Sequence, residues 1–456
     1  MGVLRSTFHV LRSGGWVTAA LLATFALGTG AAGCGDDSSP TDVPDTADAD
    51  DAGDDGTPDA GDADADGDGD ADGDADGDGD GDGDAEADGH APWSRTLIVL
   101  TTDYSTGGVS LIDLDTIPGS TVTAVDAAAV HSDAVLVCRG GADPAHAGEF
   151  FVVERTGSNR IRLLKAGGGS VSDLASLALE SGSNPQDVVP IARATGSQLA
   201  VPLYERSGLV FAAGDLSGVQ QTLDLTPLND AGGVPEMYRG AVLDTTLLVS
   251  LQLMNRTTMP WTPYGPGVLA AVALDATSDH MLLDLDTATA GTQGVQLLSA
   301  NPMGPMRLVS DGTLTRLFVS TVGTYGVNDG GIETVSDPFS GHSTGFAVTE
   351  SALGGDISDW IVVAGITGFA IVTADFTTDR LMRFNASSGM VDPDPVLESA
   401  GYTLSALADL GGGRIAVGDR TAGAAGIRVF DASSKAEITA VPINVGLPPV
   451  MACLGE

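Results

Sequence analysis

From residue 92 onward, the apolar residues of the chain come in short runs of four to eight that are rich in Val and Leu. Gly, Asn, Asp and Ser interrupt these runs. No segment has the periodicity of a long amphipathic helix, and residues 170–179 come nearest to it. Short apolar runs bounded by turn-forming residues are typical of β-strands. The pattern therefore predicts an all-β domain.

The runs form a repeating unit: a hydrophobic strand, a polar turn, a second strand and a small polar turn. Residues 96–116, 149–169, 198–218 and 413–435 are clear copies, and three looser copies lie between them. Seven such units, with a mean spacing of 53 residues, predict a seven-bladed β-propeller with four-stranded blades; six or eight blades are the alternatives. The second strands of the units begin near Gly108, Arg160, Gly208, Gly267, Gly331, Arg380 and Gly426.

Several units are preceded by one further apolar strand. The segments are NPQDVVPIARA at 184–194, NPMGPMRLVSD at 301–311 and YTLSALADL at 402–410. An Asn-Pro turn that leads into the innermost strand of a blade resembles the YVTN and NHL-like β-propellers. The resemblance covers most of residues 92–456 and implies the fold, but it implies no activity.

The two ends of the repeat region complement each other. The first unit, at Thr96, has almost no sequence before it to form an inner strand, and the C-terminal LPPVMACLGE is an apolar strand with no unit after it. We expect the last strand to join the first blade, which would close the ring without an open edge. Cys138 and Cys453 would then end neighbouring inner strands. They form either a disulfide that clasps the ring or two separate buried thiols.

The N-terminus has the features of an export signal. Residues 1–15 carry Arg5 and Arg12, and residues 16–33 are apolar and uncharged. The ending Ala-Ala-Gly-Cys at 31–34 resembles the lipobox of bacterial lipoproteins, although the family usually has Leu where this chain has Ala31. The resemblance implies a signal peptide over 1–33, a lipidated Cys34 and a cell-envelope protein held on the outer membrane by its lipid anchor. Plain secretion and a retained membrane helix are the alternatives.

Residues 34–90 predict a disordered acidic tether. Between 36 and 89 there are 24 acidic residues, no basic residue, and a single apolar residue larger than Ala or Pro, Val43. Such a segment cannot bury enough apolar surface to offset the entropy of ordering. The motif at 62–67 opens like an EF-hand loop, but Gly73 stands where the closing acid belongs. We expect weak, diffuse Ca²⁺ binding here and no cofactor.

The net charge of −42 limits the classes of partner. The domain at 91–456 contributes about −20 of it. Binding to nucleic acid depends on basic residues that neutralise phosphates, so we expect no nucleic-acid partner. Anionic lipid surfaces are disfavoured for the same reason, which leaves the lipid anchor as the expected membrane contact.

The sequence contains no recognisable catalytic site. The motif GHSTG at 341–345 matches the G-x-S-x-G elbow of hydrolases, but turn and strand patterns flank it, whereas the elbow needs a strand followed by a helix. The histidines are scattered and lack metal-ligand spacing. We therefore predict no catalytic residue and no metal site, and the absence of a catalytic constellation favours a non-enzymatic protein.

A long insertion in the fourth unit is the best candidate for a binding loop. The segment MNRTTMPWTPYGPG at 254–267 places Met259, Trp261 and Tyr264 among three prolines. Tyr325 lies in a second candidate loop, that of the fifth unit. Aromatic residues carry much of the binding energy of interfaces, and loops on a rigid scaffold carry binding sites. The alternative is a loop that only covers a blade edge.

These features favour a membrane-anchored binding or scaffolding module for a protein or glycan of the envelope. One alternative is a lactonase-like propeller hydrolase with a metal in its channel. Another is a structural spacer without a ligand.

Overall fold

The structure is a computed structural model that describes residues 93–455, except 120, 140–145, 194–195, 230–231, 276–278 and 364. The predicted signal peptide, Cys34 and the acidic tether lie outside the described residues. Within the described ranges, no helix has the length and apolar character needed to cross a membrane.

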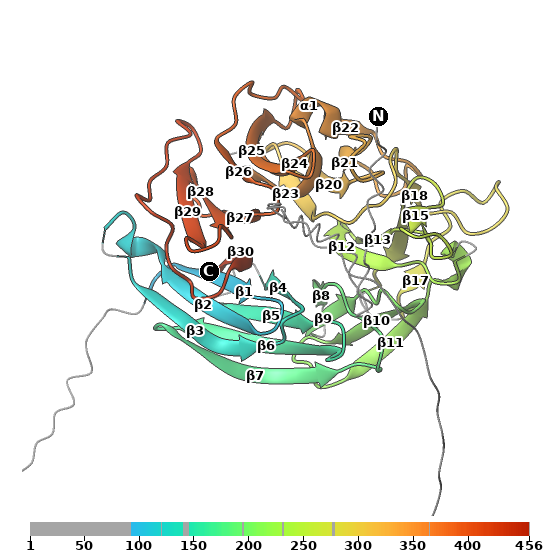
Figure 1. Cartoon of the computed structure of the whole chain (residues 1–456). Helices are drawn as coiled ribbons and strands as arrows, with labels where there is room; N and C mark the ends of the chain where they lie inside the picture. The colour runs from blue at the N-terminus through green and yellow to red at the C-terminus, as the bar shows by residue number, and fades with distance from the viewer. Residues whose placement is uncertain are drawn as a thin grey trace, which may run out of the picture. The chain divides into compact units, whose positions relative to one another are not determined.

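Seven antiparallel sheets are arranged around a central axis, so the domain is the all-β, seven-bladed propeller that the repeats predict (Figure 1). Blade 1 contains, from the inside outward, β30 (Pro449–Gly455), β1 (Thr96–Thr102), β2 (Gly107–Asp113) and β3 (Thr123–Val130). Blade 2 contains β4 (Ala134–Cys138), β5 (Glu149–Glu154), β6 (Arg160–Gly167) and β7 (Ser170–Ala178). Blade 3 contains β8 (Val189–Arg193), β9 (Gly196–Val201), β10 (Gly208–Ala213) and β11 (Val219–Asp224).

Within the described residues, blades 5 and 6 also have the predicted four strands, whereas blade 4 has five and blade 7 has three. Blade 4 contains β12 (Met237–Leu243), β13 (Thr246–Leu251), β16 (Val268–Ala273), β17 (Met281–Leu282) and β18 (Val295–Gln296), because both β17 and β18 pair with β16. Blade 5 contains β19 (Met306–Ser310), β20 (Thr315–Thr321), β21 (Gly331–Val335) and β22 (Gly345–Thr349). Blade 6 contains β23 (Asp356–Val363), β24 (Thr367–Ala374), β25 (Thr378–Asn385) and β26 (Leu397–Ala400), and blade 7 contains β27 (Leu404–Asp409), β28 (Arg414–Asp419) and β29 (Gly426–Asp431).

The core lies between the faces of neighbouring blades. Every residue of β1 and of β13 is buried, because both faces of these second strands are covered. This explains why the strands appear in the sequence as continuous apolar runs rather than as an alternating pattern. The outermost strands alternate instead. Residues 170–178, within the most helix-like stretch of the sequence, form strand β7, whose polar residues are all exposed.

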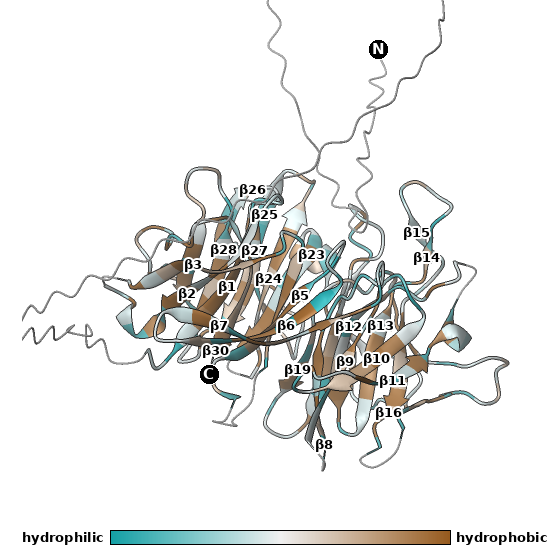
Figure 2. Cartoon of the chain, turned by 90° about the horizontal axis from the view of Figure 1, so that it is seen from below, coloured by the Kyte–Doolittle hydropathy of each residue, from teal (hydrophilic) through white to brown (hydrophobic). Residues whose placement is uncertain are grey.

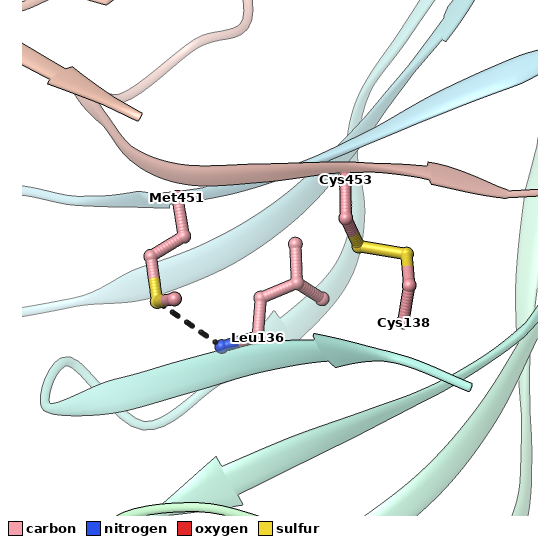
Figure 3. The surroundings of a disulfide bond; sticks show 4 residues. All are labelled: Leu136, Cys138, Met451 and Cys453. Atoms are coloured by element: carbon pink, nitrogen blue, oxygen red, sulfur yellow. Dashed lines mark hydrogen bonds between the residues drawn. A yellow bond between two sulfur atoms is a disulfide. The ribbon is translucent and has the colours of Figure 1, made fainter. Parts of the chain in front are cut away.

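The C-terminal strand closes the ring. β30 pairs antiparallel with β1, from Thr96 opposite Gly455 to Leu100 opposite Met451, so blade 1 is built from both ends of the domain. Next to this seam, Cys453 on β30 and Cys138 on β4 form a disulfide with a Cα–Cα distance of 6.0 Å (Figure 3).

The two faces of the ring carry different turns. In a four-stranded antiparallel blade, the turn after the second strand and the connection to the next blade lie on one side, and the other two turns lie on the opposite side. We call the first side the loop face and the second the opposite face. The longest feature of the loop face is a ribbon made of β14 (Met254–Asn255) and β15 (Thr262–Pro263), which projects from blade 4 (Figure 2). A short helix, α1 (Glu350–Leu353), lies in the connection from blade 5 to blade 6.

Candidate functional site

Exposed aromatic side chains gather on the loop face. Of the seven aromatic residues exposed in the described ranges, five lie in loops of this face, whereas Phe339 lies in a turn of the opposite face and Phe346 on an outer strand. Exposed aromatic rings cost free energy in water and are enriched at binding surfaces. The loop face is therefore the candidate binding face. The five residues are Tyr104, Tyr264, Tyr325, Phe376 and Tyr402.

Several tyrosines converge near the axis of the ring. Although half of the Tyr325 surface is exposed, desolvation at its hydroxyl raises its pKa, and the neighbouring groups Tyr238, Asp356, Tyr402 and Tyr204 raise it further. Tyr204 belongs to blade 3 and Tyr238 to blade 4, while Tyr402 precedes the inner strand of blade 7. These blades lie far apart around the ring, so their side chains can be close to one hydroxyl only near the central axis. We call these residues the tyrosine cluster; it occupies the axial part of the loop face.

An arginine clamp fixes the base of the β14–β15 ribbon. Arg256 contacts Glu236 through Nε at 2.5 Å and Glu205 through Nη1 at 2.6 Å. Its guanidinium also lies over the rings of Trp261, at 5.0 Å, and Tyr204, at 5.5 Å. The clamp joins blade 4 to blade 3 and holds the ribbon at a fixed place.

The clamp separates the roles of the predicted loop residues. Trp261 packs against Arg256 within the clamp, whereas Met259 is 66% exposed and Tyr264 is 44% exposed on the ribbon. Tyr325 lies in the loop of the next blade, where its hydroxyl donates to Sδ of Met303 at 2.6 Å. The insertion lies between the second and third strands of blade 4, as its place in the repeat predicts.

Sequence reasoning missed other members of the face. Tyr204, Phe376 and Tyr402 are single residues in short loops, Asp356 begins β23, and Arg256 lies in the 254–267 insertion; none of them belongs to a recognisable motif. Their positions within the repeating unit could have indicated them. Each lies either just after a second strand or just before an inner strand, and both positions belong to the loop face.

The carboxylates of the loop face fall into two groups. In blades 2 to 4 they pair with arginines: Asp133 with Arg155, Asp187 with Arg239 at 3.8 Å, and Glu205 with Arg256. In blades 5 and 6, Asp329, Glu350 and Asp356 form no ion pair with an arginine or lysine among the described residues.

The second group is held by backbone amides. Glu350 is fully buried and accepts hydrogen bonds from the N–H of Gly330 at 2.9 Å and of Ile357 at 3.0 Å. Burial raises the pKa of Glu350 to about 8, even though both amides lower it. Burial also raises the pKa of Asp356, and Asp329 raises it further. Within the described part of the chain, this half of the face therefore places three acids near one another without an arginine or lysine partner.

The G-x-S-x-G motif has a structural role. Ser343 is 4% exposed and donates to Oε2 of Glu333 at 2.7 Å. Glu333 in turn accepts from the backbone N–H groups of Leu298 and Ser299. The segment joins β21 to β22, so the strand-to-helix turn of a hydrolase elbow is not formed here. The described histidines and acids include no group of three that could hold a metal ion.

The sequence matches no protein-family model, and no curated protein matches it. Solved structures share the fold. The periplasmic gluconolactonase PpgL of Pseudomonas aeruginosa is 13% identical with a TM-score of 0.51, and the match covers 79% of this chain and 99% of that one. A putative 6-phosphogluconolactonase from Bacteroides uniformis gives the same identity, TM-score and coverage. Apo AztD from Citrobacter koseri is 13% identical with a TM-score of 0.46, over 79% and 97% of the two chains. At these identities the likeness shows the fold alone: a seven-bladed propeller like those of the lactonase type.

Proposed function

We propose that this chain is a cell-envelope binding module whose propeller presents its loop face to a protein or glycan partner. The observation that carries the proposal is the concentration of exposed aromatic rings on that face. Aromatic side chains supply a large contact area at a low entropy cost, and rigid loops of a closed ring keep them in place. Met259 and Tyr264 on the clamped ribbon, together with Tyr325, are the proposed contact residues.

The location is part of the same proposal. The Cys138–Cys453 disulfide supports an oxidising compartment outside the cytoplasm. The sequence features at 1–90 support a lipidated Cys34 and an acidic tether that holds the propeller away from the membrane. The lactonase-like alternative requires metal ligands that converge on the channel, and no group of side chains in the described ranges favours it.

Matched double variants test the proposal. Met259→Ala with Tyr264→Ala removes two exposed apolar side chains from the loop face, and Met390→Ala with Phe339→Ala removes two from the opposite face. We expect the full chain to capture a specific envelope partner, the loop-face variant to lose that partner, and the opposite-face variant to keep it. Equal capture by both variants would contradict the proposal.

A further inference from the structure

Three exposed aromatic residues lie close to one buried carboxylate on the loop face. Asp356, the first residue of β23, accepts a hydrogen bond from the backbone N–H of Gly326 through Oδ2 at 2.8 Å. Tyr325 precedes Gly326, and the ring of Phe376 lies against Gly326 so closely that a Cβ there would meet it at 2.7 Å. Asp356 also acts electrostatically on both Tyr325 and Tyr402. Loops from blades 5, 6 and 7 thus bring three rings to one acid.

The second oxygen of this carboxylate lacks a partner. Asp356 is 6% exposed, and its Oδ1 is buried without a hydrogen bond from any of the described residues. The neighbouring Asp329 provides no compensation, because its negative charge raises the pKa of Asp356 further. Leaving a buried carboxylate oxygen unpaired is costly, and an ordered water, an ion or a ligand group can satisfy such an oxygen in a native structure.

We propose that Asp356, with Tyr325, Phe376 and Tyr402 around it, binds a primary alkylammonium group. The ammonium donates a hydrogen bond to Oδ1 of Asp356, and its alkyl chain packs against the three exposed rings. Aromatic faces attract organic cations, and the attraction is strongest where water is excluded. The negative net charge of the chain raises the local concentration of such cations.

The donor set favours an amine over a metal ion. Ca²⁺ needs six to eight oxygen ligands. Here both oxygens of Glu350, Oδ1 of Asp329 and Oδ2 of Asp356 already accept backbone hydrogen bonds. Among the described residues this leaves Oδ2 of Asp329 and the buried Oδ1 of Asp356, which are too few for Ca²⁺. A quaternary ammonium would use the rings but could not donate to this oxygen. A primary alkylammonium can both donate a hydrogen bond to Oδ1 of Asp356 and pack its alkyl chain against the rings.

The inference deepens the proposed function, since it assigns a ligand chemistry to one part of the loop face. The amine comes either from a free diamine or from a lysine side chain of a partner. Cadaverine represents a free diamine, and an N-acetylated, amidated lysine represents a lysine side chain of a partner. Both probes carry the same alkylammonium group. Tighter binding of cadaverine supports a free amine, and tighter binding of the capped lysine supports a protein partner.

Calorimetric titration of the full chain with the two probes tests the site. The measurement is made at 0.15 M salt, where diffuse binding to the acidic sequence at 36–89 is largely screened. We expect one saturable site per chain, at least tenfold weaker binding in Asp356→Asn and about fivefold weaker binding in Tyr402→Ala. Tyr104→Ala is the matched control, because Tyr104 is an exposed tyrosine of the same face that pairs with Arg420 in another blade.

Two results would overturn the assignment: saturable binding that survives in Asp356→Asn, or tetramethylammonium binding as tightly as cadaverine. The absence of any saturable site in the parent chain would also overturn it. Thermal melting of each variant checks its folding, and Tyr402→Ala keeps the test decisive if Asp356→Asn unfolds. If the ribbon variant still loses its partner while cadaverine fails to bind, the amine site is wrong and the proposed binding face stands.

Discussion

Cys138 and Cys453 form a disulfide between two neighbouring inner strands although 315 positions separate them in the sequence. The bond lies beside the seam at which β30 joins β1, so it covalently fastens the chain end that closes the ring (Figure 3). A second contact joins the same two inner strands: the backbone N–H of Leu136 on β4 points to the side chain of Met451 on β30, with 3.4 Å between N and Sδ.

Removing the disulfide should loosen the closure. We expect Cys138→Ser with Cys453→Ser to lower the free energy of unfolding by about 2–5 kcal/mol, because the bond restricts a very long loop in the unfolded chain. Urea unfolding of the parent and the variant measures the difference. A loss below about 1 kcal/mol would mean that strand pairing alone closes the ring.

The Arg256 clamp gives a second prediction. Arg256→Ala leaves Glu236, which is 0% exposed, as a buried charge without its guanidinium partner. We expect a loss of about 3–5 kcal/mol in the free energy of unfolding. Arg206→Ala removes a surface pair with Glu180 and should cost less than about 1 kcal/mol. Similar losses in the two variants would show that the clamp does not hold the ribbon.

Glu350 should make stability depend on pH. Its pKa is raised from 4.5 to about 8, so the folded state prefers the neutral acid. Glu350 therefore stabilises the folded state fully below pH 4.5, and this stabilisation is lost as the pH rises to about 8. The free energy lost is about 1.4 kcal/mol for each unit by which the folded-state pKa exceeds the unfolded-state pKa. Asp356 and Asp329 raise the same pKa, and the N–H groups of Ile357 and Gly330 lower it.

Glu350→Gln isolates this contribution. The amide cannot ionise, but its one oxygen cannot accept from both backbone N–H groups, so the variant should be less stable than the parent at pH 5. The deficit should shrink by more than about 1 kcal/mol between pH 5 and pH 8. Urea midpoints at the two pH values measure it, and a constant deficit would show that Glu350 ionises normally.

Ser343 should behave as a structural residue. Ser343→Ala removes one hydrogen bond to Glu333 and should lower the free energy of unfolding by about 1–2 kcal/mol. A fluorophosphonate probe for nucleophilic serines should label neither the parent nor the variant. Labelling that is present in the parent and absent in Ser343→Ala would identify a serine nucleophile.

The fold follows from the sequence because its determinants are local and repeated. Arg160, Gly208, Gly331 and Gly426, each predicted to begin a strand, are the first residues of β6, β10, β21 and β29. The closing strand could be predicted from an imbalance between the two chain ends. The strand starts and the closing strand can both be predicted from the apolar strand pattern of the sequence.

The candidate site depends on contacts between distant segments, which no local pattern encodes. Arg256 meets Glu205 from another blade, and this contact turns Trp261 from a predicted surface residue into part of a clamp. Asp356 stands at the start of an ordinary strand, and its burial beside Tyr402 appears only when the ring is assembled. The exposure of Met259 and Tyr264 agrees with their place on a proline-rich insertion.

Partners are proposed to bind the loop face, and crosslinking inside the cell can locate the bound surface. Met259 on the loop face is 66% exposed and Met390 on the opposite face is 73% exposed, so the two positions form a matched pair. A photoreactive p-benzoylphenylalanine is placed at one or the other position of the full chain in the cell that produces it. If partners bind the loop face, we expect a discrete crosslinked product from position 259 and none from position 390. The reverse result, or equal products from both positions, would contradict it.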